Sequence, residues 1–274
     1  MTPFDQLVSI ARTAAERRAL YEFRYQVYIE EMGKPYSHAD HERKQLSDAL
    51  DDKATLLYAS KDGRIIGTVR INWGDDRTAF RAFTESCGLA DFQCFPAGSF
   101  SFCSRLMVHR DYRYSAIAAA LATRAYETGR GRSTQFNFVH CAPRLLPLFE
   151  RMGFRQYKDH FDDPEVGEQI PLVLVIEDID HLRASRSPFL GTALTRRNSR
   201  QAALWFSQQL FTYRYPTKET TTMKSTNAPS RLQELKETVA AAIEKFPDNQ
   251  VCRKVDAGEF QVTDYQKVLR MIFH

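Results

Sequence analysis

The chain has 274 residues, of which 43% are hydrophobic and 26% are charged. This is the composition of an ordinary globular protein, and it excludes a disordered, collagen-like or coiled-coil chain. The net charge of +4 is too small to indicate nucleic-acid binding, so no nucleic-acid partner is expected. No apolar run reaches the roughly 18 residues of a membrane span, and the first residues lack the pattern of a signal peptide.

The cysteines and histidines indicate a compartment and argue against a metal centre. The cysteines are Cys87, Cys94, Cys103, Cys141 and Cys252. They are odd in number and form no Cys-x-x-Cys pair, so we expect reduced thiols in a cytoplasmic protein. His38 and His41 are three residues apart, but a polar surface loop is a simpler interpretation than a metal site, and no metal is expected in the first domain.

The pattern of apolar residues predicts a mixed α/β sheet flanked by helices. The first helix spans 14–32, with Leu20, Phe23 and Val27 on one stripe, and ends at Gly33. The remaining predicted elements, in chain order, are strands 55–60, 64–73 and 99–109, a helix over 113–127, a strand over 135–141, a helix over 143–152, and strands 154–157 and 170–176. Gly129 and Gly131 are expected to end the helix that begins at 113.

Composition divides the chain into three predicted parts. Residues 1–180 form the α/β domain, 181–230 a basic helix and linker, and 231–274 a helical segment that begins an incomplete helical domain or packs on the first. The stretch 181–218 contains no acidic residue. It either faces an acidic carrier protein or a membrane surface, or is a solvated basic segment.

The sequence of 104–118 predicts a strand, a turn and the start of a helix. The start of this helix could bind a phosphate group. A helix N-terminus presents free N–H groups to an anion. Ser115, Ala116 and Ala118 would let the backbone approach a ligand, and Arg110 and Arg113 add positive charge. An ordinary strand-to-helix connection is the alternative.

The same segment resembles the acyl-donor loop of GNAT-fold N-acyltransferases. Their Arg/Gln-x-x-Gly-x-Gly/Ala pattern reads here as Arg113-Tyr114-Ser115-Ala116-Ile117-Ala118, with Ala116 in place of the first glycine. A second motif, 141–155, resembles the last helix and following strand of that family. Phe149 stands where the family often has a tyrosine that protonates the leaving thiolate. A thiol has a pKa near 8.5, so its thiolate can leave without that proton.

The N-terminal helix resembles that of long-chain N-acyl amino acid synthases and their relatives, the acyl-homoserine lactone synthases. The matching residues are Arg24, Tyr28, Asp48, Asp51, Arg70 and the pair Ser104-Arg105. Phe102 replaces a glutamate of the lactone synthases, and their loop tryptophan is not evident, which counts against a lactone product. The resemblance covers about residues 10–180.

This resemblance implies a fatty acyl donor on pantetheine, carried by an acyl carrier protein or coenzyme A, and a small-molecule amine acceptor. Backbone N–H groups of Leu106, Met107 and Val108 would hold the thioester carbonyl. The loop residues Arg113, Tyr114, Ser115, Ala116 and Ala118 would bind the donor.

Four side chains on the acceptor side are implied to be catalytic. Asp48 or Asp51 would hold the ammonium and accept a proton. Arg24 and Arg70 would bind a carboxylate or order those acids. A purely structural set of ion pairs is the alternative for each of the four.

Three further interpretations remain open. Cys141 is interpreted as structural, because its neighbour His140 should point to the opposite face of the strand. The tail 265–274 weakly resembles an early helix of heme-oxygenase-like proteins, some of which are iron-dependent oxidases. The rival functions are an acetyl-coenzyme A-dependent acetyltransferase of small amines, and a non-catalytic carrier-binding module fused to a redox-type helical domain.

Overall fold

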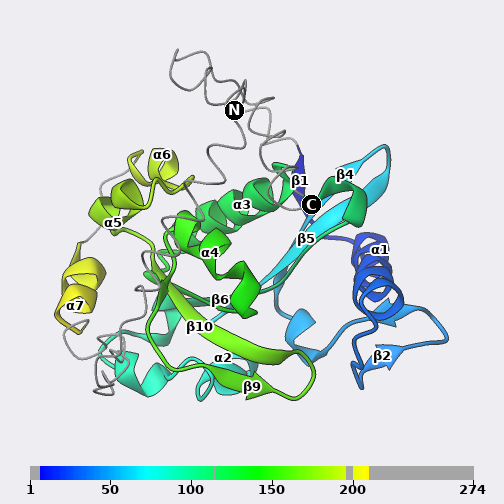
Figure 1. Ribbon diagram of the computed structural model, residues 1–274, viewed down its shortest axis with the longest axis horizontal. Coiled ribbons are helices and arrows are strands. Elements are labelled where there is room, and N and C mark those ends of the chain that lie inside the picture. The colour runs from blue at the N-terminus through cyan, green and yellow to red at the C-terminus, as the bar shows by residue number, and fades with distance from the viewer. Residues whose placement is uncertain (1–6, 114, 196–199, 210–274) are drawn as a thin grey trace, which may run out of the picture. The chain divides into compact units, whose positions relative to one another are not determined.

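The computed structural model describes residues 7–113, 115–195 and 200–209, and the structural statements below concern these residues. They belong to a compact unit that spans Met1–Tyr213, whereas Arg214–His274 form a second unit outside the described residues. The sheet of the described unit has the strand order β1-β4-β5-β6-β7-β10-β8, and β9 pairs with β10 at one side (Figure 1). Its strands are β1 Val8–Ile10, β4 Thr55–Lys61, β5 Arg64–Trp73, β6 Phe100–Val108, β7 Phe136–Cys141, β8 Arg155–Gln156, β9 Phe161–Asp163 and β10 Gly167–Val175.

The pair β6 and β7 is parallel, whereas the other described pairs of this sheet are antiparallel. Its pairing runs only from Phe100 opposite Phe136 to Phe102 opposite Phe138. Beyond Phe102, β6 has no described strand partner on the β7 side, so the two strands open toward their carboxyl ends. Ligand sites of open α/β sheets form at such carboxyl ends.

Helices cover both faces of the sheet. On one face lie α3 Ile117–Gly131, α4 Leu146–Met152 and α5 Ile179–Ala184. On the other lie α1 Ala14–Tyr25, α2 Arg77–Phe83 and α7 Gln201–Gln209. Successive side chains of β6 point to opposite faces of the sheet. Phe102 therefore packs on the face covered by α2 and α7, and Cys103 packs on the face covered by α3 and α4.

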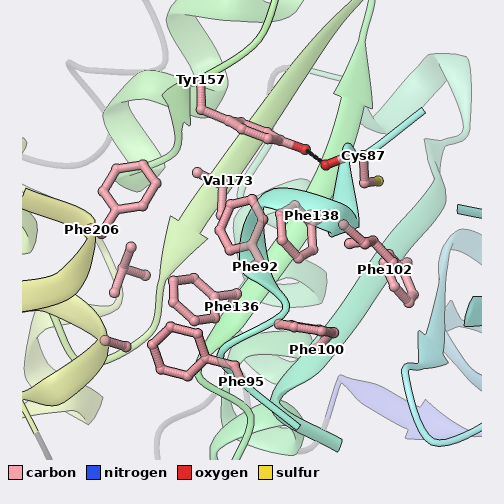
Figure 2. Close-up of a cluster of buried hydrophobic side chains, with 13 residues drawn as sticks. Cys87, Phe92, Phe95, Phe100, Phe102, Phe136, Phe138, Tyr157, Val173 and Phe206 are labelled. Atoms are coloured by element: carbon pink, nitrogen blue, oxygen red, sulfur yellow. Dashed lines mark hydrogen bonds between the residues drawn. The ribbon is translucent and has the colours of Figure 1, made fainter. Parts of the chain in front are cut away.

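An aromatic cluster fills the second face between the sheet, α2 and α7 (Figure 2). Phe92 lies at its centre, with ring centroids 5.2 Å from Phe136 and 5.0 Å from Phe138. The hydroxyl of Tyr157 donates to the carbonyl oxygen of Cys87 at 2.7 Å. Because a buried aromatic ring removes a large apolar area from water, this cluster is a main source of stability for the sheet.

The first predicted helix is confirmed, with a change of geometry in its second half. Thr13 caps the start of α1, where its side chain and that of Glu16 form a reciprocal capping box. From Gln26 to Glu31 the chain continues as a π-helix and then reaches Gly33 at φ +63°. Such wide turns are frequent at functional sites, and this one carries Tyr28.

The predicted bounds of the helix after β6 are wrong. The helix begins at Ile117 rather than Arg113, and it runs through Gly129 to Gly131. A helical glycine costs about 1 kcal/mol. Packing of Tyr126 in the core and the 2.7 Å ion pair of Arg130 with Glu177 offset that cost. The sequence pattern also missed β1, β9 and α2.

The segment after 180 is part of the same compact unit as the sheet. Leu182, Phe189 and Ala193 join the core under α3 and α4, and Ala202 and Phe206 of α7 join the aromatic cluster. The divisions at 181 and 231 remain predictions, and the proposed likeness of 265–274 lies outside the described residues.

Replacing Gly67 with alanine is expected to destabilise the fold by about 1–3 kcal/mol, because it overpacks the contact between β5 and α3. A Cβ atom there would lie 2.9 Å from Leu121 Cδ1 and 3.0 Å from both Ile117 Cγ2 and the Met107 carbonyl oxygen. Urea unfolding would measure the loss. The control is Gly191→Ala, where a Cβ meets nothing within 4 Å. Equal stability of the two variants would contradict close packing of α3 on β5.

Candidate functional site

A charged cluster lies on the face of the sheet that α1 covers. It consists of Arg24 on α1, Asp48 and Asp51 around the short helix η2 (Ala49–Asp51), Arg70 on β5 and Arg105 on β6. The structure therefore brings together the four residues that the sequence predicted as catalytic, and adds Arg105. Three guanidiniums face two carboxylates in this cluster.

The inner part of the cluster is a buried ion pair. Arg24 Nη1 lies 2.8 Å from Asp51 Oδ1, and the two side chains are 0% and 2% exposed. Burial lowers the pKa of the Arg24 guanidinium, and the charge of Asp51 opposes that shift. Nε and Nη2 of Arg24 have no hydrogen-bond partner among the described residues. With no exposed surface, Arg24 is placed to order Asp51 rather than to touch a substrate.

The second carboxylate, Asp48, forms the outer part of the cluster and reaches solvent. Its side chain is 20% exposed, accepts from Arg70 Nη1 at 2.5 Å through Oδ1, and accepts from Arg105 Nη2 at 2.9 Å through Oδ2. The N–H of Leu50 also donates to Oδ1 at 2.9 Å. Burial alone would raise the pKa of Asp48, but the charges of Arg70 and Arg105 outweigh it and hold the pKa below its usual range.

Two further contacts tie Asp48 and Arg70 in place. The Asp48 N–H donates to Asp51 Oδ2 at 2.9 Å, which closes a capping box over η2. Arg70 Nε donates to the hydroxyl of Ser104 on β6 at 3.0 Å. Both acids are thus fixed by backbone as well as side-chain contacts, so the geometry of the cluster is set before any ligand arrives.

A β-bulge places Arg105 in the cluster. Thr68 pairs with Met107 and Arg70 pairs with Ser104, so β6 has one residue more than β5 between these pairs. Arg105 takes the left-handed conformation there, at φ +56°. Bulges re-aim side chains, and a non-glycine residue in this conformation is a frequent mark of a functional site.

Aromatic rings hold the Arg105 guanidinium in place. Its Cζ lies 5.4 Å from the ring centroid of Tyr28 and 4.6 Å from that of Tyr36. His38 Nε2 lies 3.2 Å from Arg105 Nη2. The sequence pointed to Arg105 only through the Ser-Arg pair, because nothing in a run of strand residues marks a bulge.

Neither histidine of the predicted polar loop joins a metal cluster. His38 contacts Arg105, and His41 Nδ1 lies 2.9 Å from the hydroxyl of Tyr25. In the part of the chain that the structure describes, no group of three or more potential ligands could hold a metal ion.

The predicted donor side lies at the carboxyl ends of β6 and β7. Leu106, Met107 and Val108 follow the bulge, on the part of β6 that has no described partner toward β7. Ser115, Ala116 and Ala118 surround the start of α3, where no side chain caps the helix apart from the Ser115 hydroxyl near the Ile117 N–H at 3.3 Å.

Arg113 precedes that helix in a turn. Its Nε donates to the Val108 carbonyl oxygen at 3.2 Å, and its Nη2 lies 2.5 Å from Glu31 Oε1. These contacts fasten the turn to β6 and to the end of the first helical segment. Tyr114, which the sequence also assigned to the donor loop, is outside the described residues.

The thiol near this side is not an activated nucleophile. Burial raises the pKa of Cys141 to about 11, and its side chain packs in the core with Phe149. As predicted, His140 does not meet it but lies on the other face, with Nε2 3.5 Å from Cys87 Sγ. Burial lowers the pKa of His140 to about 4 and raises that of Cys87 to about 12, so at pH 7 this pair is uncharged.

Replacing Cys141 with alanine is therefore expected to change kcat/KM for acyl transfer by no more than about twofold, because a buried thiol of raised pKa contributes no thiolate. Steady-state kinetics would test this. Loss of activity in a folded Cys141→Ala protein, or a covalent acyl adduct on that thiol, would contradict direct transfer.

Comparison with known proteins identifies the family. The family model described as N-acyl amino acid synthase FeeM matches residues 19–176. That match covers more than half of the chain and all five residues of the charged cluster. The chain belongs to this family.

The FeeM family assignment makes the chain an N-acyltransferase that uses an acyl thioester donor. Among solved structures, TofI in a ternary complex with an inhibitor and MTA matches with a TM-score of 0.52 and 16% identity, over 66% of this chain and 97% of that one. This likeness confirms the GNAT-like α/β fold. No curated protein matches the chain.

Two other solved structures are similar at lower scores. The coenzyme A-dependent acyl-homoserine lactone synthase BjaI, with SAM and isopentyl-CoA, matches with a TM-score of 0.49 and 17% identity over 62% of this chain and 82% of that one. A putative N-acetyltransferase from Lactobacillus plantarum matches with a TM-score of 0.46 and 18% identity over 62% of this chain and 97% of that one.

Within the described residues, no helix is both long and apolar enough to cross a membrane.

Proposed function

We propose that this FeeM-family enzyme transfers a long-chain acyl group from a pantetheine thioester on an acyl carrier protein to the amine of an amino acid. The observation that carries the proposal is the bulge at Arg105. At this bulge Arg105 pairs with the partly exposed carboxylate of Asp48, which also pairs with Arg70, and Leu106–Val108 follow directly on the part of β6 that has no described partner toward β7. An amine held at Asp48 and a thioester held on that part of β6 would meet at the same point of the sheet.

On the donor side, the pantetheine arm would lie between the diverging ends of β6 and β7. N–H groups of Leu106–Val108 that point toward this opening would hold the thioester carbonyl oxygen as negative charge develops on it. The start of α3, with Arg113, Ser115, Ala116 and Ala118, would take the phosphate of the arm. Phe149 is buried at 7% exposure and has no proton to give, so the thiolate would leave unprotonated.

On the acceptor side, Asp48 would hold the incoming ammonium by charge. Its lowered pKa makes it a poor proton acceptor, so we assign it the placement of the amine and assign the proton to water at the exposed edge. The free amine nitrogen then attacks the carbonyl carbon, the C–S bond breaks, and the nitrogen loses its second proton to water, so that an amide and a thiolate result without an acyl-enzyme.

The other members of the charged cluster would position Asp48. Arg70 and Arg105 fix its two oxygens, and the buried pair of Arg24 with Asp51 holds the end of η2 against α1. Arg105, whose Nη1 has no described partner, is the guanidinium we assign to the acceptor's carboxylate.

The free thiols Cys87, Cys94, Cys103 and Cys141 favour a reducing compartment, and we place the enzyme in the cytoplasm.

The test is a transfer assay with mass detection. Purified protein is incubated with acyl-carrier-protein and acyl-coenzyme A donors of several chain lengths and a mixture of amino acids. A long-chain N-acyl amino acid is the expected product. An exclusively acetylated small amine would replace the proposal with the acetyltransferase alternative. No transfer from any donor by the folded protein would leave a carrier-binding module as the better account.

A further inference from the structure

An apolar and basic patch is exposed where the donor would enter. Leu145 and Leu148 are 38% and 41% exposed, and they belong to the small set of large hydrophobic side chains that reach solvent in the described residues. Arg144 and Arg151 flank them and are exposed as well. These four residues, on η6 (Pro143–Leu145) and α4, are called the α4 patch. Leu148 and Arg151 are three residues apart and share a face of α4.

The topology places the α4 patch at the mouth of the predicted donor site. Since β6 and β7 are parallel neighbours, their carboxyl ends lie at one edge of the sheet. The chain enters α3 after β6, and it enters η6 and α4 directly after β7. Both helices lie on the same side of the sheet (Figure 1). The patch therefore lies beside the edge at which the proposed pantetheine arm reaches the Leu106–Val108 segment.

At least one positive charge of the α4 patch has no acidic neighbour. No acidic partner of Arg144 is found in the described part of the chain. The same holds for Arg110, which lies in the connection between β6 and α3. Glu150 is also exposed on α4, but it is two residues from Leu148 and so points away from the face of Leu148 and Arg151.

We propose that the α4 patch is the docking surface for an acidic acyl carrier protein. This inference rests on the proposed function, because it assumes a donor carried on a protein. A coenzyme A donor needs only a phosphate site, whereas two exposed leucines between arginines have the make-up of a protein interface, with apolar anchors and a charged rim. An acidic partner supplies the matching charge.

The basic stretch at 181–218 is a weaker candidate for this surface. Two of its described arginines, Arg183 and Arg200, share Asp180, with contacts of 3.5 and 2.5 Å. Their charge is thus partly neutralised within the protein. Leu194 and Leu204 are exposed in that stretch as well, so the feature that favours the α4 patch is its place directly after β7, at the end where β6 and β7 open.

The test compares two donors that carry the same acyl chain. One is the acyl carrier protein thioester, and the other is acyl-pantetheine, which has the arm without the protein. Arg144→Glu and Leu148→Asp each change an exposed side chain of the patch. The matched controls are Arg81→Glu on α2 and Leu204→Asp on α7, both exposed and on the opposite face of the sheet.

Both patch variants are expected to raise KM for the carrier-protein donor about tenfold or more, to leave kcat/KM for acyl-pantetheine unchanged, and to weaken the salt dependence of the first reaction. The control variants should match the unmodified enzyme with both donors. Equal kinetics of patch and control variants, or an equal loss with both donors, would overturn the proposal.

Other outcomes separate this inference from the function on which it rests. Transfer from acyl-pantetheine or acyl-coenzyme A but not from the carrier protein would overturn the docking surface and leave acyl transfer intact. A change of oligomeric mass or of vesicle binding in Leu148→Asp, with an unchanged KM for the carrier, would assign the patch to a second copy or a membrane instead. Failure of the unmodified enzyme with every donor would refute the proposed function itself.

Discussion

Replacing Asp48 with asparagine is expected to lower kcat/KM for acyl transfer about 100-fold or more, because the acceptor ammonium loses the negative charge that places it. The amide keeps an oxygen for the Leu50 N–H and for one of the arginines, so the fold should survive. The measurement is steady-state kinetics with the amino-acid acceptor varied, together with a urea unfolding curve of the same protein.

The control for this substitution is Asp52→Asn, which removes an exposed carboxylate from the same loop. It should leave both kinetics and stability near those of the unmodified protein. Wild-type kcat/KM in a folded Asp48→Asn enzyme would reduce the charged cluster to the structural ion pairs that the sequence left as an alternative.

Replacing Asp51 with alanine is expected to lower the free energy of unfolding by about 3–5 kcal/mol, because it leaves the fully buried Arg24 guanidinium without its counter-ion. The Nε and Nη2 groups of Arg24 already lack a hydrogen-bond partner among the described residues, so no other described group can replace Asp51. Asp51 also caps η2, so the loop that carries Asp48 should loosen and activity should fall with stability.

A double variant separates the two effects. Arg24→Met combined with Asp51→Leu removes both charges, and it should recover much of the stability that Asp51→Ala loses. If Asp51→Ala costs less than about 1 kcal/mol, the value of an exposed ion pair, then the pair is not buried as described.

Much of this fold could be predicted from the sequence because its periodic elements are long and regular. The run from Ala14 to Met32 lacks glycine and proline, and the β-branched strand after Asp62-Gly63 is equally clear. The four predicted catalytic side chains do come together, since the family motifs fix which residues share a site even where no distance is known.

The parts that sequence reasoning missed depend on tertiary contacts. Arg105 enters the cluster only because β6 bulges opposite Val69, and no turn residue marks that bulge. The short elements in 74–99 are held by the aromatic cluster around Phe92 (Figure 2) rather than by local periodicity. Gly129 is tolerated in α3 for the same kind of reason, as packing outweighs its intrinsic cost.

The most direct test of the proposed function is a structure of the enzyme with a bound N-acyl amino acid product. We expect the acyl carbonyl oxygen to lie on the N–H groups of Leu106–Val108. We also expect the amide nitrogen beside Asp48 and the carboxylate on Arg105. A product bound elsewhere, with Asp48 engaged only by Arg70 and Arg105, would show that this bulge does not join the donor and acceptor sites.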